Sequence, residues 1–235
     1  MKRIVYSICA AILFMAAAQT VSAQSEETRQ VSGFNSIGSA GPFNVHVKID
    51  GTESLRIKAD KAVISEIETV VEDGKLQIKF KHREHWDRDM GKNPIEVYVS
   101  AKSLSGLSNA GSGNIDVEGT LNGENVKVSL SGSGNITTGV KSDDLRLSIS
   151  GSGSIHLHGS AGQAKISIAG SGQLMAKGFK VGDASVSIAG SGNAYFAAEK
   201  NISAHIAGSG NVIYSGSASV SDSHTIGSGR VSKED

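Results

Sequence analysis

Three basic residues recur at one position of a repeated sequence pattern. Lys127, Arg146 and Lys165 each lie five residues before the first glycine of a Gly-Ser-Gly tripeptide, in three successive repeats. If the repeats stack as parallel strands, these side chains would lie about 4.8 Å apart in a basic stripe. Because lysine and arginine bind carboxylate and sulfate groups, the stripe indicates a surface for an anionic glycan. The alternative is a solvated face on which Asp143 and Asp144 neutralise Arg146.

A second candidate is the segment His82–Asp89, in which Trp86 could stack on a sugar ring. The histidines and aspartates of this segment could meet a metal ion, but they match no specific metal motif. Mixed charge close to Pro94 is typical of an exposed loop. His156 and His158 face one side of a strand but lack a third ligand. We therefore predict Trp86 as a ligand-binding residue, with no metal ion or other cofactor.

Gly-Ser-Gly tripeptides recur at intervals of 18 to 21 residues, which is typical of a solenoid with one structural unit per coil. Apolar residues alternate with polar ones before each tripeptide, as in Val126, Val128 and Leu130, and this alternation predicts half-buried strands. A helical repeat would space its apolar residues three or four apart. We predict an all-β fold, a single-stranded right-handed parallel β-helix with coils of about 19 residues, each built of two or three short strands. The first glycines of the tripeptides are Gly111, Gly132, Gly151, Gly170, Gly190, Gly208 and Gly227.

The tripeptide and the residue after it have a structural explanation. Each coil must turn at the same point, and glycine permits the positive φ angles that such turns often require. An asparagine follows the tripeptide in four repeats, and stacked amides can hydrogen-bond to one another in a ladder. We interpret these four residues as a structural ladder rather than as a binding site. They are Asn114, Asn135, Asn193 and Asn211.

The sequence predicts three segments, with boundaries after residues 23 and 105. Two basic residues precede an apolar run that ends in small residues, and this order predicts a signal peptide over residues 1–23, cleaved after Ala23. The alternative is an uncleaved anchor, but the apolar run is shorter than the twenty or so residues that span a bilayer. Residues 24–105 are β-like without the tripeptide, and we expect this half to cap or continue the solenoid of residues 106–235.

Composition limits the function classes. The 23 basic and 23 acidic residues become 21 and 23 once the predicted signal peptide is removed, so no net field attracts nucleic acid or a membrane surface. Cys9 is the only cysteine and lies in that signal peptide, so disulfides are not expected. Acidic residues such as Asp116, Asp144 and Asp183 are expected in different phases of the repeat, whereas a glycosidase needs two neighbouring carboxylates. We therefore predict a protein that is not an enzyme.

The order of motifs resembles a known family. The segment Val31–Ile37 comes first, a β-rich half follows, and Gly-Ser-Gly-Asn coils end at Val212–Gly216. This arrangement resembles the head GIN domain family of putative auto-transporter adhesins over nearly all of the predicted mature chain. The resemblance implies an exported β-helix and brings no catalytic residues with it.

These observations predict an exported, adhesin-like protein that presents a regular surface to an anionic glycan or a cell-envelope protein. It would act in the periplasm, at the outer membrane or outside the cell, as neither an integral membrane protein nor a nucleic-acid binder. A second hypothesis is a structural or assembly module that binds a protein partner, or forms a homo-oligomer, through its β-rich half. A polysaccharide-acting enzyme is the third. Glycan binding would depend on Lys127, Arg146 and Lys165 and weaken with salt, whereas self-assembly would give a concentration-dependent oligomer that does not depend on these residues.

Overall fold

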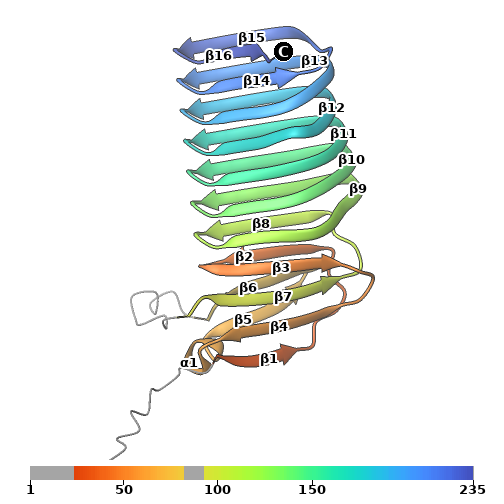
Figure 1. Cartoon of the computed structure of the whole chain (residues 1–235), viewed down its shortest axis with the longest axis vertical. Coiled ribbons are helices and arrows are strands. Elements are labelled where there is room, and N and C mark those ends of the chain that lie inside the picture. Colours follow the sequence, from red (N-terminus) through yellow and green to blue (C-terminus); the bar gives the residue numbers. More distant parts are fainter. Residues whose placement is uncertain (1–23, 82–92, 235) are drawn as a thin grey trace, which may run out of the picture.

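The computed structural model describes residues 24–81 and 93–234, and 76% of them lie in strands (Figure 1). Sixteen strands form one sheet that coils around a single core in about seven turns of about 19 residues. The predicted β-solenoid is therefore confirmed. The helix α1 (Lys61–Ile64) has four residues, and nowhere in the described ranges is a helix long and apolar enough to cross a membrane.

Each of the middle coils is one long strand that bends around the core. The expectation of two or three short strands per coil is wrong there, because backbone pairing continues through the bend. The pairing of β10 with β11, for example, runs from Asn135 opposite Ser154 to Gly151 opposite Gly170, interrupted only at Asp143. Shorter strands form the C-terminal end. The strands are β9 (Asn114–Gly132), β10 (Asn135–Gly151), β11 (Ser154–Gly170), β12 (Gln173–Gly190), β13 (Asn193–Gly208), β14 (Asn211–Ser215), β15 (Ser219–Gly227) and β16 (Arg230–Lys233).

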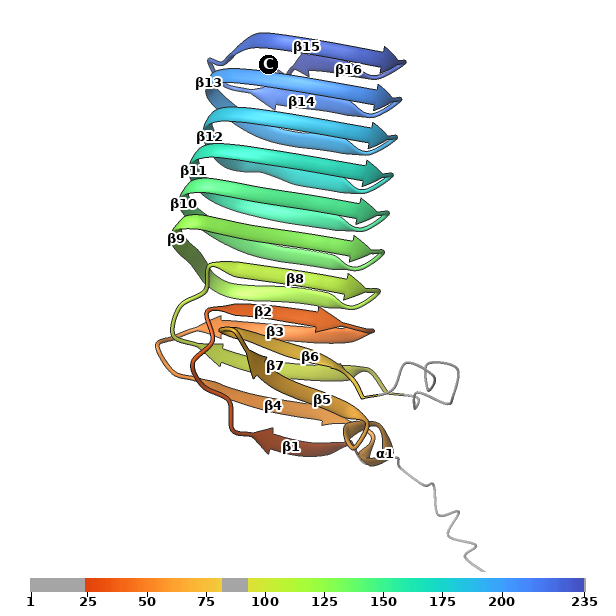
Figure 2. The ribbon, with the colours of Figure 1, turned by 180° about the vertical axis from the view of Figure 1, so that it is seen from behind.

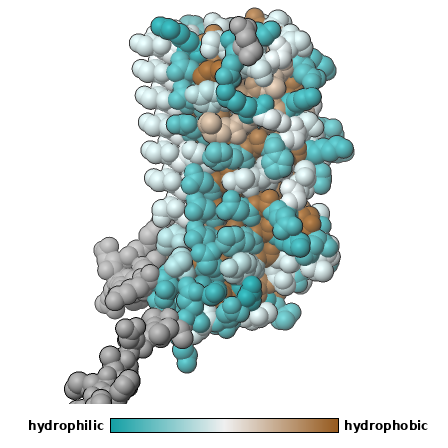
Figure 3. Space-filling view, in the orientation of Figure 1, coloured by the Kyte–Doolittle hydropathy of each residue, from teal (hydrophilic) through white to brown (hydrophobic). Residues whose placement is uncertain are grey.

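The Gly-Ser-Gly corners require glycine at both ends of the tripeptide. The first glycine takes a positive φ, as predicted, and Gly132 has a φ of 117°. The second glycine is required for a different reason, the close approach of neighbouring coils. A Cβ at Gly153 would collide with the carbonyl oxygen of Gly134 in the preceding coil. The corners can therefore stack in contact, and they form a pale, regular column along one edge of the molecule in Figure 3.

One coil precedes the first Gly-Ser-Gly. The strands β2 and β3 meet at a corner made by Gly41, whose carbonyl accepts a hydrogen bond from the N–H of Gly113 at 3.2 Å. β2 pairs with β8 and β3 with β9, all parallel, so this coil lies directly against the repeats. The other N-terminal strands continue the stack beyond it (Figure 2). The bounds are β1 (Ser25–Arg29), β2 (Ser36–Ala40), β3 (Phe43–Ile49), β4 (Ser54–Ala59), β5 (Ile67–Glu72), β6 (Lys75–Phe80), β7 (Ile95–Ala101) and β8 (Gly106–Gly111).

Each coil has two faces, which we name by their place relative to the corner. The leading face consists of the segments that follow a corner, together with β1, β4, β7 and β3. The trailing face consists of the segments that precede the next corner, together with β5, β6, β2 and β8. The two faces lie back to back across the core, and Figures 1 and 2 view them from opposite directions.

The core is a column of apolar rows along the axis. The second position after each corner points inward, and its side chain is fully buried from Ile115 and Ile136 as far as Val212 but only partly buried at Val231, after the last corner. The two ends of the column differ. At the N-terminal end Val63 and Ile64 of α1 are buried, whereas at the C-terminal end the whole of β15 is exposed.

Candidate binding surfaces

The basic stripe consists of Lys127, Arg146 and Lys165 on the trailing face. The three residues are direct neighbours in the strand register, and all three side chains are exposed. In the described part of the chain none of the three side chains takes part in a hydrogen bond or an ion pair, so Asp143 and Asp144 form none with the Arg146 guanidinium. The three cations are therefore free to meet an anion from solution.

Two polar columns flank the basic stripe. On one side the serines Ser129 and Ser148 share a hydrogen bond of 2.6 Å between their hydroxyl oxygens, and a hollow of about 330 Å³ separates this column from the cations. On the other side a hollow of about 420 Å³ is lined by acidic and amide side chains. The stripe thus lies between two shallow depressions that run along the trailing face.

The acidic column corrects one expectation from the sequence. Asp144 and Asp183 occupy the same column, with Gln163 between them, and not different phases of the repeat. Each of the two aspartates lies seven residues before the first glycine of the next corner, but their distances from the preceding corner differ by one residue. The strand pairing near them keeps a constant distance to the next corner, so the two side chains fall in the same column. Two coil steps place them about 10 Å apart. Asp183 also accepts a hydrogen bond from Asn201 at 2.9 Å.

The predicted asparagine positions form two runs of hydrogen bonds on the leading face. The amide of Asn135 donates to Asn114 at 2.9 Å, and Asn114 donates to Asn44 at 3.1 Å. Farther along, Asn211 donates to Asn193 at 3.0 Å. Ser154 and Gln173 stand between the two runs. The residue Asn44 was missed in the sequence because its corner contains no Gly-Ser-Gly.

Two other candidate sites from the sequence add no binding surface to this description. Trp86 and the segment His82–Asp89 lie outside the described residues. His156 and His158 are exposed on β11, and residues 24–81 and 93–234 contain no group of three side chains suited to a metal ion.

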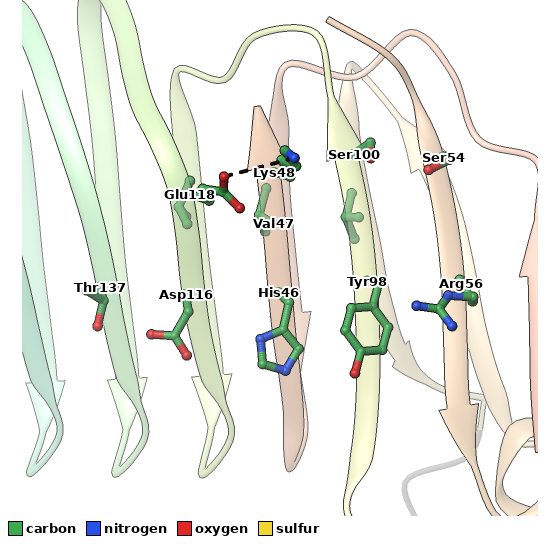
Figure 4. Close-up of a pocket in the computed structure, with 12 residues that line it drawn as sticks. His46, Val47, Lys48, Ser54, Arg56, Tyr98, Ser100, Asp116, Glu118 and Thr137 are labelled. Carbon is green, nitrogen blue, oxygen red and sulfur yellow. Dashed lines mark ion pairs between the residues drawn. The ribbon is translucent and has the colours of Figure 1, made fainter. Parts of the chain in front are cut away.

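A further hollow lies on the leading face, at residues that sequence reasoning did not select as a site. We name it the His46–Tyr98 groove, with a volume of about 650 Å³. Figure 4 shows its central row, in which Arg56, Tyr98, His46, Asp116 and Thr137 come from β4, β7, β3, β9 and β10 in turn. Side chains from both halves of the chain therefore meet in one surface.

Planar side chains stack at the centre of this row. The guanidinium carbon of Arg56 lies 4.5 Å from the centroid of the Tyr98 ring, and the His46 ring stacks on Tyr98 with centroids 5.1 Å apart and planes 22° apart. A cation over an aromatic face is attracted by the ring quadrupole. Both faces of Tyr98 are thereby covered, and its ring edge and hydroxyl remain for contact with a ligand.

Carboxylates hold the two ends of the stack. Arg56 forms an ion pair with Glu26 at 2.9 Å, and Nε2 of His46 lies 2.6 Å from Glu96, which also accepts a hydrogen bond from Asn44 at 2.9 Å. Burial pushes the pKa of Glu96 upward, but the hydrogen bonds from Asn44 and His46 outweigh it and hold the pKa below its ordinary value. Glu96 is therefore ionised at neutral pH and fixes the His46 ring.

A weak sequence signal for the groove exists. Alternation with buried Val45 and Val47 places His46 on the outside of its strand, and Val97 and Val99 do the same for Tyr98. Alternation does not reveal which strands are neighbours. The order β4, β7, β3, β9 brings together residues from distant parts of the chain, and no repeat marks it.

Comparison with known proteins identifies the family of this fold. The model of the family described as putative auto-transporter adhesin, head GIN domain, matches residues 33–218. The chain belongs to this family. The match spans the His46–Tyr98 groove, the basic stripe and all the long coils, so both surfaces are parts of the head GIN domain.

Solved structures share the head GIN domain fold. A putative adhesin from Bacteroides fragilis is 22% identical with a TM-score of 0.80, covering 90% of this chain and 97% of its own. A putative adhesin from Parabacteroides merdae is 25% identical with a TM-score of 0.70, covering 91% and 97%. A putative lipid binding protein from Parabacteroides distasonis is 22% identical with a TM-score of 0.67, over the same shares of the two chains. Among curated proteins, none matches this chain.

Proposed function

We propose that this head GIN domain protein is an exported, adhesin-like binding protein that holds an anionic glycan along the basic stripe. The observation that carries the proposal is the alignment of Lys127, Arg146 and Lys165 on three consecutive coils, with side chains that form no hydrogen bond or ion pair to the described residues. A row of cations at the strand spacing of about 4.8 Å suits a polymer with regularly spaced carboxylates or sulfates.

The two hollows beside the stripe support a polymeric ligand. Both run past Arg146 and Lys165, so a chain lying along the axis could contact cations and serine hydroxyls together. The adhesin-like family and the predicted signal peptide support export to the periplasm, the outer membrane or the medium. Acidic polysaccharides are the expected ligands, and the role is that of a binding protein and not of an enzyme.

Salt-dependent glycan binding tests the proposal. Protein beginning at Gln24 would be applied to an array of neutral, uronic-acid and sulfated glycans at low and high salt. We expect binding to the acidic glycans that weakens with salt, because exposed charges are screened. The triple variant Lys127→Ser, Arg146→Ser and Lys165→Ser should lose this binding, and serine suits the fold because Ser185 and Ser203 occupy the same column.

A matched control removes three positive charges from positions outside the basic stripe. Lys141, Lys180 and Lys200 are exposed, and replacing all three by serine removes the same charge. This variant should bind acidic glycans as the unchanged protein does. Equal losses in both triple variants would mean that only overall charge matters, and no binding by the unchanged protein would end the glycan proposal.

A second candidate function is assembly with a protein partner or with a second copy. The observation in its favour is that, among the described strands of the β-rich half, β1 pairs with β4 alone and β5 with β6 alone, which leaves each with one edge unpaired by them. At the other end Ile226 is 65% exposed on β15. Unpaired edges are templates for strand addition. A molecular mass that rises with concentration, unchanged in the triple stripe variant, would support assembly, and a constant monomer mass would contradict self-assembly.

A further inference from the structure

The His46–Tyr98 groove lies on the leading face, across the core from the basic stripe. Its side chains come from five adjacent strands whose backbones are hydrogen-bonded in fixed register. Sites on paired strands are more rigid than sites on loops. A concave, largely pre-formed surface of this kind is the usual form of a small-ligand site.

The stacked side chains make one wall of the groove rigid. Arg56, Tyr98 and His46 cover one another's faces, and Glu26 and Glu96 fix the two ends of the stack. A sugar ring therefore cannot stack on either face of Tyr98. Contact with a ligand must be made by polar edges, through hydrogen bonds.

Next to this wall lie polar groups that have no partner among the residues the structure describes. No hydrogen bond or ion pair within the described ranges engages the Asp116 carboxylate, the Thr137 hydroxyl or the Tyr98 hydroxyl. Figure 4 shows Asp116 between Thr137 and His46 in the central row. A carboxylate accepts several hydrogen bonds, while hydroxyls both donate and accept, so the set suits a ligand with several hydroxyl groups.

The two cations of the groove are already paired. Arg56 forms its ion pair with Glu26 at 2.9 Å, and Lys48 lies 4.0 Å from Glu118. Neither cation is therefore left to attract an anionic ligand. This distinguishes the groove from the basic stripe, whose cations have no ion-pair partner among the described residues.

We propose that the His46–Tyr98 groove binds an uncharged sugar residue of a polysaccharide. Asp116 accepts hydrogen bonds from two neighbouring sugar hydroxyls, and Thr137 and the hydroxyl of Tyr98 bind at the adjacent positions. This site goes beyond the function proposed for the basic stripe and does not depend on it, because the two surfaces occupy opposite faces.

Calorimetric titration with neutral hexose oligosaccharides, namely glucans, mannans and galactans, tests this site. We expect at least one of them to bind equally well at low salt and at about 1 M salt, where exposed charges are screened. Asp116→Ala should weaken that binding about tenfold or more, since hydrogen bonds to a charged group are the strong ones. Tyr98→Phe keeps the ring stack but removes the hydroxyl, and it should weaken sugar binding by a smaller factor than Asp116→Ala does.

Two controls separate this site from the stripe and from misfolding. Asp143→Ala removes an exposed aspartate outside the groove and should leave binding unchanged. The triple stripe variant should also bind the neutral sugar normally. The proposal is overturned if no neutral oligosaccharide binds, if Asp116→Ala binds as well as the unchanged protein, or if the binding disappears with salt and with the stripe variant.

Discussion

The two candidate surfaces differ in how the chain makes them. The basic stripe repeats one position of one motif, so Lys127, Arg146 and Lys165 become neighbours simply because successive coils stack. The His46–Tyr98 groove is assembled from single positions on strands that are distant in sequence, with Arg56 and Asp116 on opposite sides of the His46–Tyr98 stack. Repetition gives a long surface of uniform chemistry, while assembly gives a compact surface with several kinds of polar group.

The largest expected effect comes from breaking the repeat itself. Gly153→Ala places a methyl group against the carbonyl oxygen of Gly134 and near the side chain of Leu130. Forcing a group into such a contact should cost roughly 3 kcal/mol of unfolding free energy, measured by urea denaturation. Because coils in a solenoid depend mainly on their neighbours, the stripe should lose its register while the groove keeps its ligand.

Gly178→Ala is the matched control for that change. A Cβ at Gly178 meets no heavy atom within 4 Å, so the substitution should leave the unfolding free energy nearly unchanged. If Gly153→Ala were equally harmless, the close stacking of the corners would not be what requires glycine.

Acid should affect the groove before it affects the stripe. The folded protein holds the pKa of Glu96 below its ordinary value, so the stabilisation by this carboxylate is complete above the unfolded value of 4.5. It is lost as the pH falls through the lower folded value. We expect the melting temperature to fall with pH below about 4.5, and to fall less steeply in Glu96→Gln.

The exposed Glu124, which has no hydrogen-bond partner among the described residues, provides the comparison for Glu96. Glu124→Gln makes the same change of side chain outside the groove and is therefore the matched control for the substitution itself. Identical pH profiles for Glu96→Gln and the unchanged protein would show that Glu96 does not support the His46 ring as the hydrogen bonds indicate.

The smallest expected effect concerns the asparagine ladder. Asn135→Ala removes the hydrogen bond to Asn114 and should cost about 1 kcal/mol of unfolding free energy in urea denaturation. Gln173→Ala removes a side-chain amide in the same column that forms no hydrogen bond to the described residues, and it should cost little. Equal costs for the two variants would argue against a structural contribution from the ladder.

Sequence reasoning predicted those parts of the molecule that one repeating rule governs. The inward positions of Ile115 and Ile136 and the positive φ of Gly132 follow from period two and from the corner motif. The same rule missed the coil at Gly41, since no Gly-Ser-Gly marks it. It also missed the groove, because the order of the N-terminal strands depends on long-range pairing that alternation of polar and apolar residues does not specify.

The two ends of the described chain lie at opposite ends of the stack, so the number of coils sets the distance between them. The first strand, β1, lies at one end of the stack, and the final strands β15 and β16 lie at the other (Figure 1). Each coil therefore adds one strand spacing, about 4.8 Å, to the distance between them. Loss or duplication of a whole coil would shorten or lengthen the molecule by that fixed step while leaving the remaining corners in register. Length in this protein is thus a quantity that changes in units of one repeat.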